Sequence, residues 1–495
     1  MIPPSQAETA ALLRRLAGGG APVETHISLV FLGDDTVCKL RKQVRLPFLD
    51  FSSLAERRRT AQREFDLNAP HAPGLYRDVV PVMRRPDGGL TIGGDGEVVD
   101  WVVRMARVPA GDFLDVIAAQ GGLDAALLDA LGDAVAGYLA AAPAQSLDGL
   151  AAQQWMTDGN VRSARAANLP EAEVAAWQAA MQRELPRRAG WLRGRADHGF
   201  VRRCHGDLHL GNICLWRGAP VPFDAVEFDE AIATGDVAYD LGFLLMDLEH
   251  KAGRAAANRV LNRYVARTGD WALVAGLPLF MAQKAMVRAH VEAARGNADE
   301  ARAYLKMSLG YLHPSSPMVL AIGGLQGTGK STLARAIAPE LGAAPGALLL
   351  RSDELRKRRN GVAPETHLPE AAYGEAENRA VALELQRAIA EVAAAGHAAI
   401  GDAMFLHPAS RRGIAEAAGT APFAGIWLEA PLPVLAARIA RRTHDASDAT
   451  VEVLHRTAGA DPGPITWTRV DATDLDRALM RVRAIVRDAN TARPC

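Results

Sequence analysis

The stretch from His205 to Asn212 combines residue types that suit proton transfer and metal binding. It reads His-Gly-Asp-Leu-His-Leu-Gly-Asn between strand-like apolar residues, and Asp224 follows twelve residues after Asn212. A carboxylate at Asp207 can accept the proton of an attacking hydroxyl group. The side-chain oxygens of Asn212 and Asp224 can coordinate Mg²⁺ beside a triphosphate. The spacing therefore predicts a phosphoryl-transfer site, with Asp207 as the catalytic base and Asn212 and Asp224 as metal ligands.

Such a site also needs a cation for the phosphates and a carboxylate that holds this cation. Lys39 lies in the second strand of an expected hairpin, and Glu64 lies in the helix expected to follow. We therefore expect Lys39 and Glu64 to bind the nucleotide together, with Glu56 as a competing choice for the carboxylate. The turn of the hairpin reads Gly33-Asp-Asp and is not a glycine-rich loop, so the phosphates must be covered differently than in protein kinases.

Two other interpretations of the same stretch remain open. Side chains of the zinc-binding types occur at Cys204, His205, His209 and Cys214. A zinc site would leave Asp207 and Asn212 without a role, and the spacing is not that of a standard zinc finger. The simplest alternative is a polar turn without any chemistry.

A glycine-rich loop at residues 324–331 reads Gly-Leu-Gln-Gly-Thr-Gly-Lys-Ser. It fits the pattern GxxxxGK[ST], with an apolar strand expected before it and a helix after it. Glycines let backbone N–H groups wrap phosphates, and the start of the helix adds positive potential. Lys330 would reach the β- and γ-phosphates, and Ser331 would hold Mg²⁺. The expected nucleotide-binding residues are Gly324, Gly327, Thr328, Gly329, Lys330, Ser331 and Thr332.

Two carboxylates follow the strands expected beside this loop. Asp353 follows the segment LLLRS and Asp402 follows AAIG, at the carboxyl ends of strands, where ligands bind in open α/β sheets. We expect Asp402 to position Mg²⁺ and Asp353 to orient or deprotonate an acceptor hydroxyl, although each could instead cap a helix. Arg438 and Arg442 cluster with Arg441 on one later helix, as a catalytic lid over the γ-phosphate or as a solvated basic face.

The elements that must position these residues follow from hydrophobic patterning. In the first part of the chain, the expected strands are 23–32, 36–42, 79–84 and 98–108, and a strand–loop–strand passage covers 200–228. The expected helices are 54–67, a series over 111–191 and a second series up to residue 312. We expect one domain over residues 1–312, with a first lobe at 1–108 and a second lobe at 109–312.

The pattern changes after residues 313–317, His-Pro-Ser-Ser-Pro, which we expect to be a linker. Strands then alternate with helices, which predicts a parallel sheet covered on both faces. The expected strands are 318–323, 347–351, 398–401 and 424–429, and the expected helices are 331–341, 370–395 and 433–442. We therefore expect a second domain over residues 318–495.

The segment HGDLHLGN resembles the signature of aminoglycoside phosphotransferases and choline-kinase-like enzymes. The resemblance covers about residues 26–248, and Asp240 in GDVAYDLGFLL matches an aspartate that supports the catalytic loop in that family. It implies an α+β bilobal, protein-kinase-like domain. Ala-Val-Glu follows Asp224 in place of Phe-Gly, as is usual in the small-molecule branch of these enzymes.

The second part of the chain resembles small-molecule P-loop kinases of the gluconate-kinase-like and zeta-toxin-like group. The resemblance covers about residues 318–471 and rests on GGLQGTGKST, RSDELRKRRNG and GDAMFLHPASRR, and it extends to the ARIARR…SDA stretch. It implies an α/β three-layer P-loop domain with a parallel sheet, of the AAA-type ATPase class. The whole chain is similar to bacterial fusions of an aminoglycoside phosphotransferase-like domain with such a kinase or ATPase domain.

Composition narrows the class of partner. The 495 residues include 56 Lys and Arg and 57 Asp and Glu, a net charge of −1, which argues against nucleic acid or an anionic membrane as a partner. No apolar run approaches the ~18–20 residues of a membrane span. The 4 cysteines, with no CxxC pair among them, favour a reducing compartment. We therefore expect a cytoplasmic protein that acts on small molecules.

The main hypothesis is a bifunctional enzyme with one site in each domain. We expect each site to use ATP or GTP with Mg²⁺ and to transfer the γ-phosphoryl group to hydroxyl groups of small molecules. One alternative is a regulatory ATPase in which one domain senses nucleotide and switches the other. A second alternative is a toxin-like kinase that acts on a cell-wall precursor.

Overall fold

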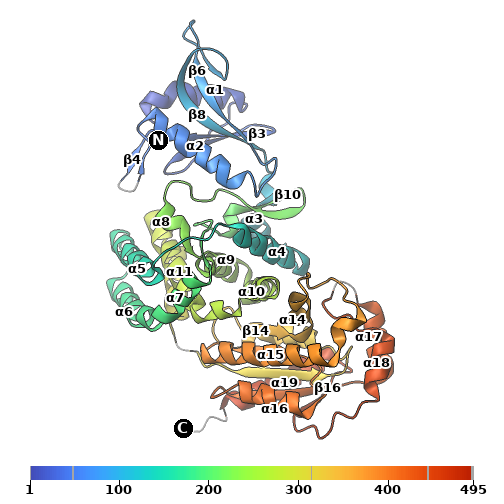
Figure 1. Cartoon of the computed structure of the whole chain (residues 1–495). Helices are drawn as coiled ribbons and strands as arrows, with labels where there is room; N and C mark the ends of the chain where they lie inside the picture. Colours follow the sequence, from blue (N-terminus) through green and yellow to red (C-terminus); the bar gives the residue numbers. More distant parts are fainter. Residues whose placement is uncertain (1, 47–48, 314, 443–444, 492–495) are drawn as a thin grey trace. The chain divides into compact units, whose positions relative to one another are not determined.

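The computed structural model describes residues 2–46, 49–313, 315–442 and 445–491 (Figure 1). The chain divides into two compact units. The first unit contains residues 1–130, 137–152 and 193–244, and the second contains residues 131–136, 153–192 and 245–495. The domain boundary expected at 313–317 stays a prediction, and Pro314 within it lies outside the described residues.

The first unit is built on a six-stranded antiparallel sheet with the order β1-β2-β3-β8-β6-β7. Its strands are β1 (Val23–Glu24), β2 (Ser28–Leu32), β3 (Thr36–Arg41), β6 (Tyr76–Arg84), β7 (Leu90–Ile92) and β8 (Glu97–Ala106). Because β3 pairs with both β2 and β8, its residue Lys39 lies opposite Val30 on one side and Val103 on the other. The sheet therefore fixes the backbone of Lys39 on both sides.

One helix covers each face of this sheet. Leu13 of α1 (Ala7–Leu16) packs with Leu29 and Leu40, whereas Ala61 of α2 (Leu54–Asn68) packs with Val103. The Ser53 hydroxyl accepts a hydrogen bond of 3.1 Å from the N–H of Glu56, which caps the start of α2. The short hairpin before α2 consists of β4 (Arg45–Leu46) and β5 (Leu49–Asp50).

The remaining strands of the first unit frame the predicted catalytic segment. β10 (Ile213–Trp216) and β11 (Ala219–Pro222) form an antiparallel hairpin, and β9 (Val201–Arg203) pairs with β12 (Thr234–Asp236). Residues 204–212 therefore connect β9 to β10. Besides α1 and α2, the helices that lie in this unit or begin in it include α3 (Leu114–Ala119), α4 (Ala125–Ala141), α8 (Glu230–Ala233) and α9 (Val237–Ala252).

The second unit contains helices from before residue 313 as well as the region that follows. These earlier helices are α5 (Gly149–Ala166), α6 (Glu171–Arg187), α7 (Ala189–Asp197), α10 (Arg254–Thr268), α11 (Leu277–Ala294) and α12 (Ala298–Tyr311), of which α5 and α7 also contribute residues to the first unit. Trp177 and Met181 on α6 are fully buried among them. Among the helices that the structure describes, none is both long enough and apolar enough to cross a membrane.

A five-stranded, all-parallel sheet forms the centre of the region after residue 318. Its strands are β13 (Val319–Gly324), β14 (Leu348–Arg351), β15 (Ala399–Asp402), β16 (Phe423–Glu429) and β17 (Thr468–Asp471). The spatial order is β14-β15-β13-β16-β17, so the chain moves to one side of β13 first and then to the other. Such a reversal opens a crevice at the carboxyl ends of the strands, directly after β13.

Helices cover both faces of this sheet. On one face, α13 (Lys330–Ile337) and α19 (Leu475–Thr491) pack onto a core that includes Leu320 and Ile322. On the other face lie α15 (Glu375–Ala394) and α16 (Pro408–Ala417), and Ile414 of α16 reaches Gly401. The predicted fold class is confirmed: a kinase-like α+β region precedes a three-layer P-loop region with a parallel sheet.

Several elements of the second unit differ from the expected ones. Helix α13 ends at Ile337, because Pro339 lies in a 3₁₀ turn that follows it. Helix α17 (Leu432–Arg441) corresponds to the helix expected at 433–442. The expected elements did not include α14 (Ser352–Arg359), α16, α18 (Val451–Ala458), β17 or α19. Helix α14 reads SDELRKRR and has no apolar stripe, and β17 has a single buried residue, Val470. Neither pattern carries a periodic signal.

Replacement of Ile322 by alanine tests the central strand. Ile322 on β13 is fully buried, so Ile322→Ala should lower the free energy of unfolding of this region by ~2–5 kcal/mol. Hydrogen exchange of the β13 and β16 amides in mild denaturant measures the loss. Leu383→Ala, at an exposed position of α15, is the control and should leave the exchange rates unchanged. Equal exchange in the two variants would contradict the assignment of β13 as the core strand.

Candidate functional site

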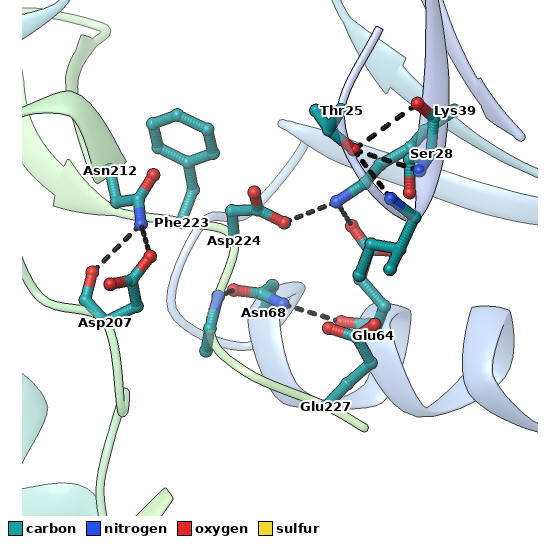
Figure 2. Close-up of polar contacts among 12 residues, drawn as sticks. Thr25, Ser28, Lys39, Glu64, Asn68, Asp207, Asn212, Phe223, Asp224 and Glu227 are labelled. Atoms are coloured by element: carbon teal, nitrogen blue, oxygen red, sulfur yellow. Dashed lines mark hydrogen bonds and ion pairs between the residues drawn. The ribbon is translucent and has the colours of Figure 1, made fainter. Parts of the chain in front are cut away.

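Lys39 lies in a buried cluster of charged side chains in the first unit. Its Nζ contacts Glu64 Oε1 at 2.7 Å and also contacts Asp224 Oδ1, and Figure 2 shows it between the two carboxylates. Burial alone would lower the pKa of Lys39, but Asp224 and Glu64 outweigh this effect and raise the pKa. The competing candidate Glu56 pairs instead with Arg59 on the surface of α2, at 3.0 Å. The structure thus brings Lys39, Glu64 and Asp224 together.

Helix α2 also holds the segment that carries Asp224. The Asn68 amide donates to the carbonyl of Glu64 at 2.8 Å, and its Oδ1 accepts from the N–H of Ala225 at 3.0 Å. The N–H of Asp224 donates to Tyr76 Oη at 3.1 Å. Asp224 has a φ of 61°, a left-handed conformation that aspartate adopts more readily than most residues. The surrounding bonds hold this strained backbone and direct the carboxylate at Lys39.

Arg41 and Glu227 extend the cluster behind Lys39. The Arg41 guanidinium contacts both Glu64 and Glu227, and all three side chains are buried. Burial raises the pKa of Glu227 to about 7, although Arg41 acts in the opposite direction. Burial would also raise the pKa of Asp224, but Lys39 lowers it below the ordinary value. Glu227 is therefore the member of the cluster that can change charge near neutral pH.

The β10–β11 hairpin sets Asn212 beside the Asp224 segment. Ile213 is paired with Pro222, and the N–H of Phe223 donates to the carbonyl of Asn212 at 3.0 Å, so Asp224 follows one residue later. The Asn212 amide nitrogen donates to the carbonyl and to Oδ2 of Asp207, at 2.9 and 3.0 Å. In Figure 2, Asp224 lies between this pair and Lys39.

Asp240 and His205 hold the backbone of the predicted catalytic loop, residues 205–212. The Asp240 carboxylate accepts from the N–H of His205 at 2.7 Å and from that of Gly206 at 3.1 Å. The His205 ring lies within 2.9 Å of the carbonyl of Phe223, and its Nδ1 accepts from the N–H of Asp207 at 3.3 Å. Burial lowers the pKa of His205. A neutral imidazole thus links the loop to the segment of Asp224.

The residues of the zinc interpretation do not converge on one point. Cys204 Sγ donates to the carbonyl of Gly235 at 3.6 Å, and His209 Nδ1 accepts from the N–H of Gly211 at 3.1 Å. Cys214 is buried in an apolar cluster. Within the described ranges, no group of three or more His, Cys, Asp or Glu side chains could hold a metal ion.

The glycine-rich loop of the second unit has a backbone that other residues would not tolerate. Gly324 has a φ of 135° and Gly327 a φ of 80°. A Cβ atom would lie 2.5 Å from the carbonyl oxygen of Leu428 at the first position and 2.6 Å from that of Leu435 at the second. Both glycines are therefore required by the close approach of β16 and α17 to the loop.

Lys330 and Ser331 start α13 at the carboxyl end of β13. Lys330 Nζ donates to the carbonyls of Gly324 and Leu325 at 2.9 and 2.8 Å, and burial lowers its pKa. The neutral carbonyls and the nearby Asp402 and Asp353 do not offset the cost of removing this cation from water, so the site suits an anion such as a phosphate. Ser331 Oγ donates to Asp402 Oδ2 at 2.5 Å, as the register Ile322–Asp402 allows.

Arg351, at the end of β14, connects the carboxylates around this loop. Its guanidinium contacts Glu354 at 3.0 Å, Asp402 at 3.3 Å and Asp445 at 2.9 Å. Asp353 follows two residues later, and burial raises its pKa. A carboxyl group with a raised pKa is a better proton acceptor than an exposed one.

One cavity of about 1030 Å³ collects most of the residues predicted for the second site. The predicted residues that line it are Gly327, Gly329, Lys330, Ser331, Thr332, Asp353, Asp402, Arg438 and Arg442. Gly324 and Thr328 do not line the cavity: Gly324 is the last residue of β13, and the buried Thr328 side chain donates to the carbonyl of Leu325 at 2.8 Å. The Arg438 guanidinium contacts the carbonyls of Ala472 and Thr473, at 2.9 and 3.1 Å. Arg442 contacts that of Ala449 at 2.8 Å.

Some residues of both sites were not predicted from the sequence. They are Arg41, Glu227, Arg351, Asp445 and Asp448. Asp448 holds the loop after α17 through Lys357 and through Tyr373 Oη, at 2.5 Å from the latter. A basic residue at the end of an apolar strand, as in LLLR, was the available signal for Arg351. Asp445 and Asp448 lie in the ARIARR…SDA stretch, which carried no predicted role for them, and Arg41 and Glu227 have no local pattern.

Two curated relatives match nearly the whole chain. Proteins of Mycobacterium tuberculosis and Mycobacterium bovis, both named as uncharacterised, are 28% identical over 467 residues, which is 90% of this chain and 91% of theirs.

Solved structures match each part separately. A gluconokinase from Sinorhizobium meliloti is 20% identical and covers 36% of this chain and 98% of its own, with a TM-score of 0.26. A choline kinase from Cryptosporidium parvum is 8% identical and covers 61% of this chain and 94% of its own, with a TM-score of 0.39. An aminoglycoside phosphotransferase in complex with GDP and kanamycin is 13% identical and covers 61% and 97%, with a TM-score of 0.36.

Family models match the two parts of the chain that carry the two sites. Residues 44–277 match the model described as the phosphotransferase enzyme family, and they include Glu64, Asp207, Asn212 and Asp224. Residues 319–459 match the model described as a AAA domain, and they include the glycine-rich loop. The chain thus has a region similar to the phosphotransferase enzyme family, followed by a region similar to a AAA domain.

Proposed function

We propose that this protein is a bifunctional kinase with two separate sites, each of which transfers the γ-phosphoryl group of ATP to a hydroxyl group of a small molecule. The observation that carries the proposal is that each site has its own lysine, Lys39 or Lys330, near its own carboxylates. Bound Mg-ATP would supply the transferable phosphoryl group at each site, with GTP as the other candidate nucleotide. We expect both reactions to take place in the cytoplasm.

In the first site, the roles follow from the contacts. Lys39, held by Glu64, binds the phosphates, and Asp224 and Asn212 offer oxygen ligands for Mg²⁺. Asp207, which is hydrogen-bonded to Asn212, accepts the proton of the acceptor hydroxyl. The hydrogen bond from Asn212 to Asp207 orients the base toward the metal ligands.

In the second site, the loop glycines expose backbone N–H groups to the phosphates, with Lys330 beside them. Ser331 and Asp402, already hydrogen-bonded to each other, are the candidates for holding Mg²⁺. Asp353 orients or deprotonates the acceptor. Arg438 and Arg442 line the cavity and add positive charge near the transferred group.

Nucleotide stoichiometry tests the two-site proposal. The full chain should bind about two molecules of a non-hydrolysable Mg-ATP analogue, one in each site, because each site has a complete set of residues. Lys330→Ala and Asp224→Ala should each lower the count to about one, and the double variant should bind none. Isothermal titration calorimetry gives the count. Lys306→Ala, an exposed lysine on α12, is the control. A count of one in the wild type, abolished by either substitution, would contradict separate sites.

Asp207→Asn separates chemistry from binding in the first site. The variant should keep the affinity for the Mg-ATP analogue but lose ~10²–10⁴-fold in transfer, because an amide cannot accept the hydroxyl proton. The assay adds γ-labelled ATP and a metabolite extract to the full chain with Lys330→Ala, so that only the first site acts. Asp148→Asn, at an exposed position before α5, is the control. Labelling at the undiminished rate would rule out Asp207 as the base.

The pH dependence of nucleotide binding tests the cluster behind Lys39. As pH rises through about 7, Glu227 loses its proton. The net charge of the cluster formed by Lys39, Arg41, Glu64, Asp224 and Glu227 then changes from zero to negative. Affinity of the first site for Mg-ATP should therefore fall by roughly 3- to 10-fold between pH 6 and pH 8. Glu227→Gln should remove this dependence, whereas Glu230→Gln, at an exposed position, should retain it. A pH profile that is identical in wild type and Glu227→Gln would show that Glu227 does not titrate in this range.

A further inference from the structure

Strand β14 is an edge strand of the parallel sheet, and helix α10 lies against its free edge. β14 pairs only with β15, and the N–H of Leu348 points to that side, where it donates to the carbonyl of Ala398 at 2.9 Å. Since successive N–H groups of a strand point in opposite directions, the N–H of Leu349 points away from the sheet. An unpaired edge of this kind needs a partner.

Two asparagines of α10 take the place of a neighbouring strand. Asn262 Oδ1 accepts from the N–H of Leu349 at 2.7 Å, and its Nδ2 donates to the carbonyl of Ala347 at 3.3 Å. The Nδ2 of Asn258, which is buried, donates to the same carbonyl at 3.1 Å. One amide thus satisfies the carbonyl of one residue and the N–H of the residue two further on, as a paired strand would.

The chain just before β14 is held by the same helix. Arg254 Nη2 donates to the carbonyls of Gly342 and Ala343, at 2.7 and 3.0 Å. Gly346 has a φ of 117°, and a Cβ atom there would lie 2.8 Å from Asn258 Nδ2. α10 is therefore packed closely along the whole approach to β14 and is not a loosely adjacent helix.

The carboxyl end of β14 leads directly into the cavity. Arg351 is the last residue of the strand and contacts Asp402 and Asp445, and Asp353 follows in the first turn of α14. Only three residues separate Leu349 from Asp353. By contrast, Lys330 and the glycine-rich loop depend on β13 and α13, two elements away from the edge. A change at the edge should thus move Arg351 and Asp353 more than the phosphate-binding loop.

We propose that Asn258 and Asn262 on α10 are positioning residues of the second kinase site, which act by fixing β14 and with it Arg351 and Asp353. This inference rests on the proposed function of that site. Helix α10 precedes the expected linker, so an element from the first part of the chain would contribute to the activity of the second site. Misplacement of a reacting group by a fraction of an ångström to about 1 Å is enough to reduce a rate by ~10- to 10²-fold.

The test uses the full chain with Asp224→Ala, so that hydrolysis of Mg-ATP reports on the second site alone. Water is the acceptor in this assay: its oxygen attacks the γ-phosphorus, the bond to ADP breaks, and ADP, phosphate and a proton are released. Asn262→Ala in this background should lower kcat ~10-fold or more and leave KM for Mg-ATP within ~2-fold. Asn160→Ala removes a more deeply buried asparagine on α5, which contacts the Gln283 carbonyl and not β14, and should change neither constant.

Hydrogen exchange provides a readout independent of activity. Asn262→Ala should raise exchange in peptides from β14 and the start of α14 and leave β13 and the glycine-rich loop unchanged. If exchange rises across β13 and β16 as well, the variant is destabilised as a whole. In that case Asn262→Asp is the variant to measure, because it keeps the acceptor for the Leu349 N–H. It should show a loss of kcat smaller than that of Asn262→Ala.

The outcomes distinguish this inference from the proposed function. If Lys330→Ala abolishes hydrolysis but Asn262→Ala and Asn262→Asp have the kcat of the background, the positioning role is wrong and the kinase proposal stands. A similar loss in Asn160→Ala would also overturn the positioning role. If Lys330→Ala does not change hydrolysis, or the background has none, the proposed function of the second site fails and this inference fails with it.

Discussion

A buried ammonium group must find compensation for the water it has lost, and the two lysines of this chain do so in opposite ways. Lys39 is surrounded by carboxylates, which raise its pKa. Lys330 is held by the neutral carbonyls of Gly324 and Leu325, and burial lowers its pKa. An anion that enters the second site gains the attraction of Lys330, which Asp402 and Asp353 offset only in part. In the first site it must compete with Asp224, which is why a metal ion that binds Asp224 and phosphate together suits that site.

The same electrostatic constraint explains the arginines that surround both lysines. Arg41 shares Glu64 with Lys39 and binds Glu227, so the carboxylates that Lys39 needs do not repel each other without compensation. In the second unit, Arg351 links Glu354, Asp402 and Asp445, which come from separate segments. Each arginine makes several contacts through one planar group, for which the single ammonium of lysine is less suited. These arginines therefore hold the acidic residues in place, and the two lysines are the cations proposed to bind the phosphates.

Sequence patterns predicted the parts of both sites that depend on local spacing. The loop from His205 to Asn212 and the loop at 324–331 are continuous segments, and the strands before and after them have clear hydrophobic patterns. Lys39 and Glu64 could be expected because strand and helix follow one another at short range. Arg41, Glu227 and Asp445 could not, since their roles depend on contacts between elements distant in the chain. Helix α14, with its charged surface, lacked the periodic signal altogether.

The two edges of the parallel sheet show why one of them needed a helix from an earlier part of the chain. β17, at one edge, is short and exposed, and a surface pair of Arg469 with Glu429 lies on it, so charge alone discourages further pairing. The same solution at β14 would place charges near Arg351, where the balance of charge already depends on one guanidinium that contacts three carboxylates. Asparagine is neutral and both donates and accepts, so Asn262 can satisfy the edge without disturbing that balance. The charged groups at the end of β14 thus limit what can cover its edge, and the neutral asparagines of α10 meet that limit.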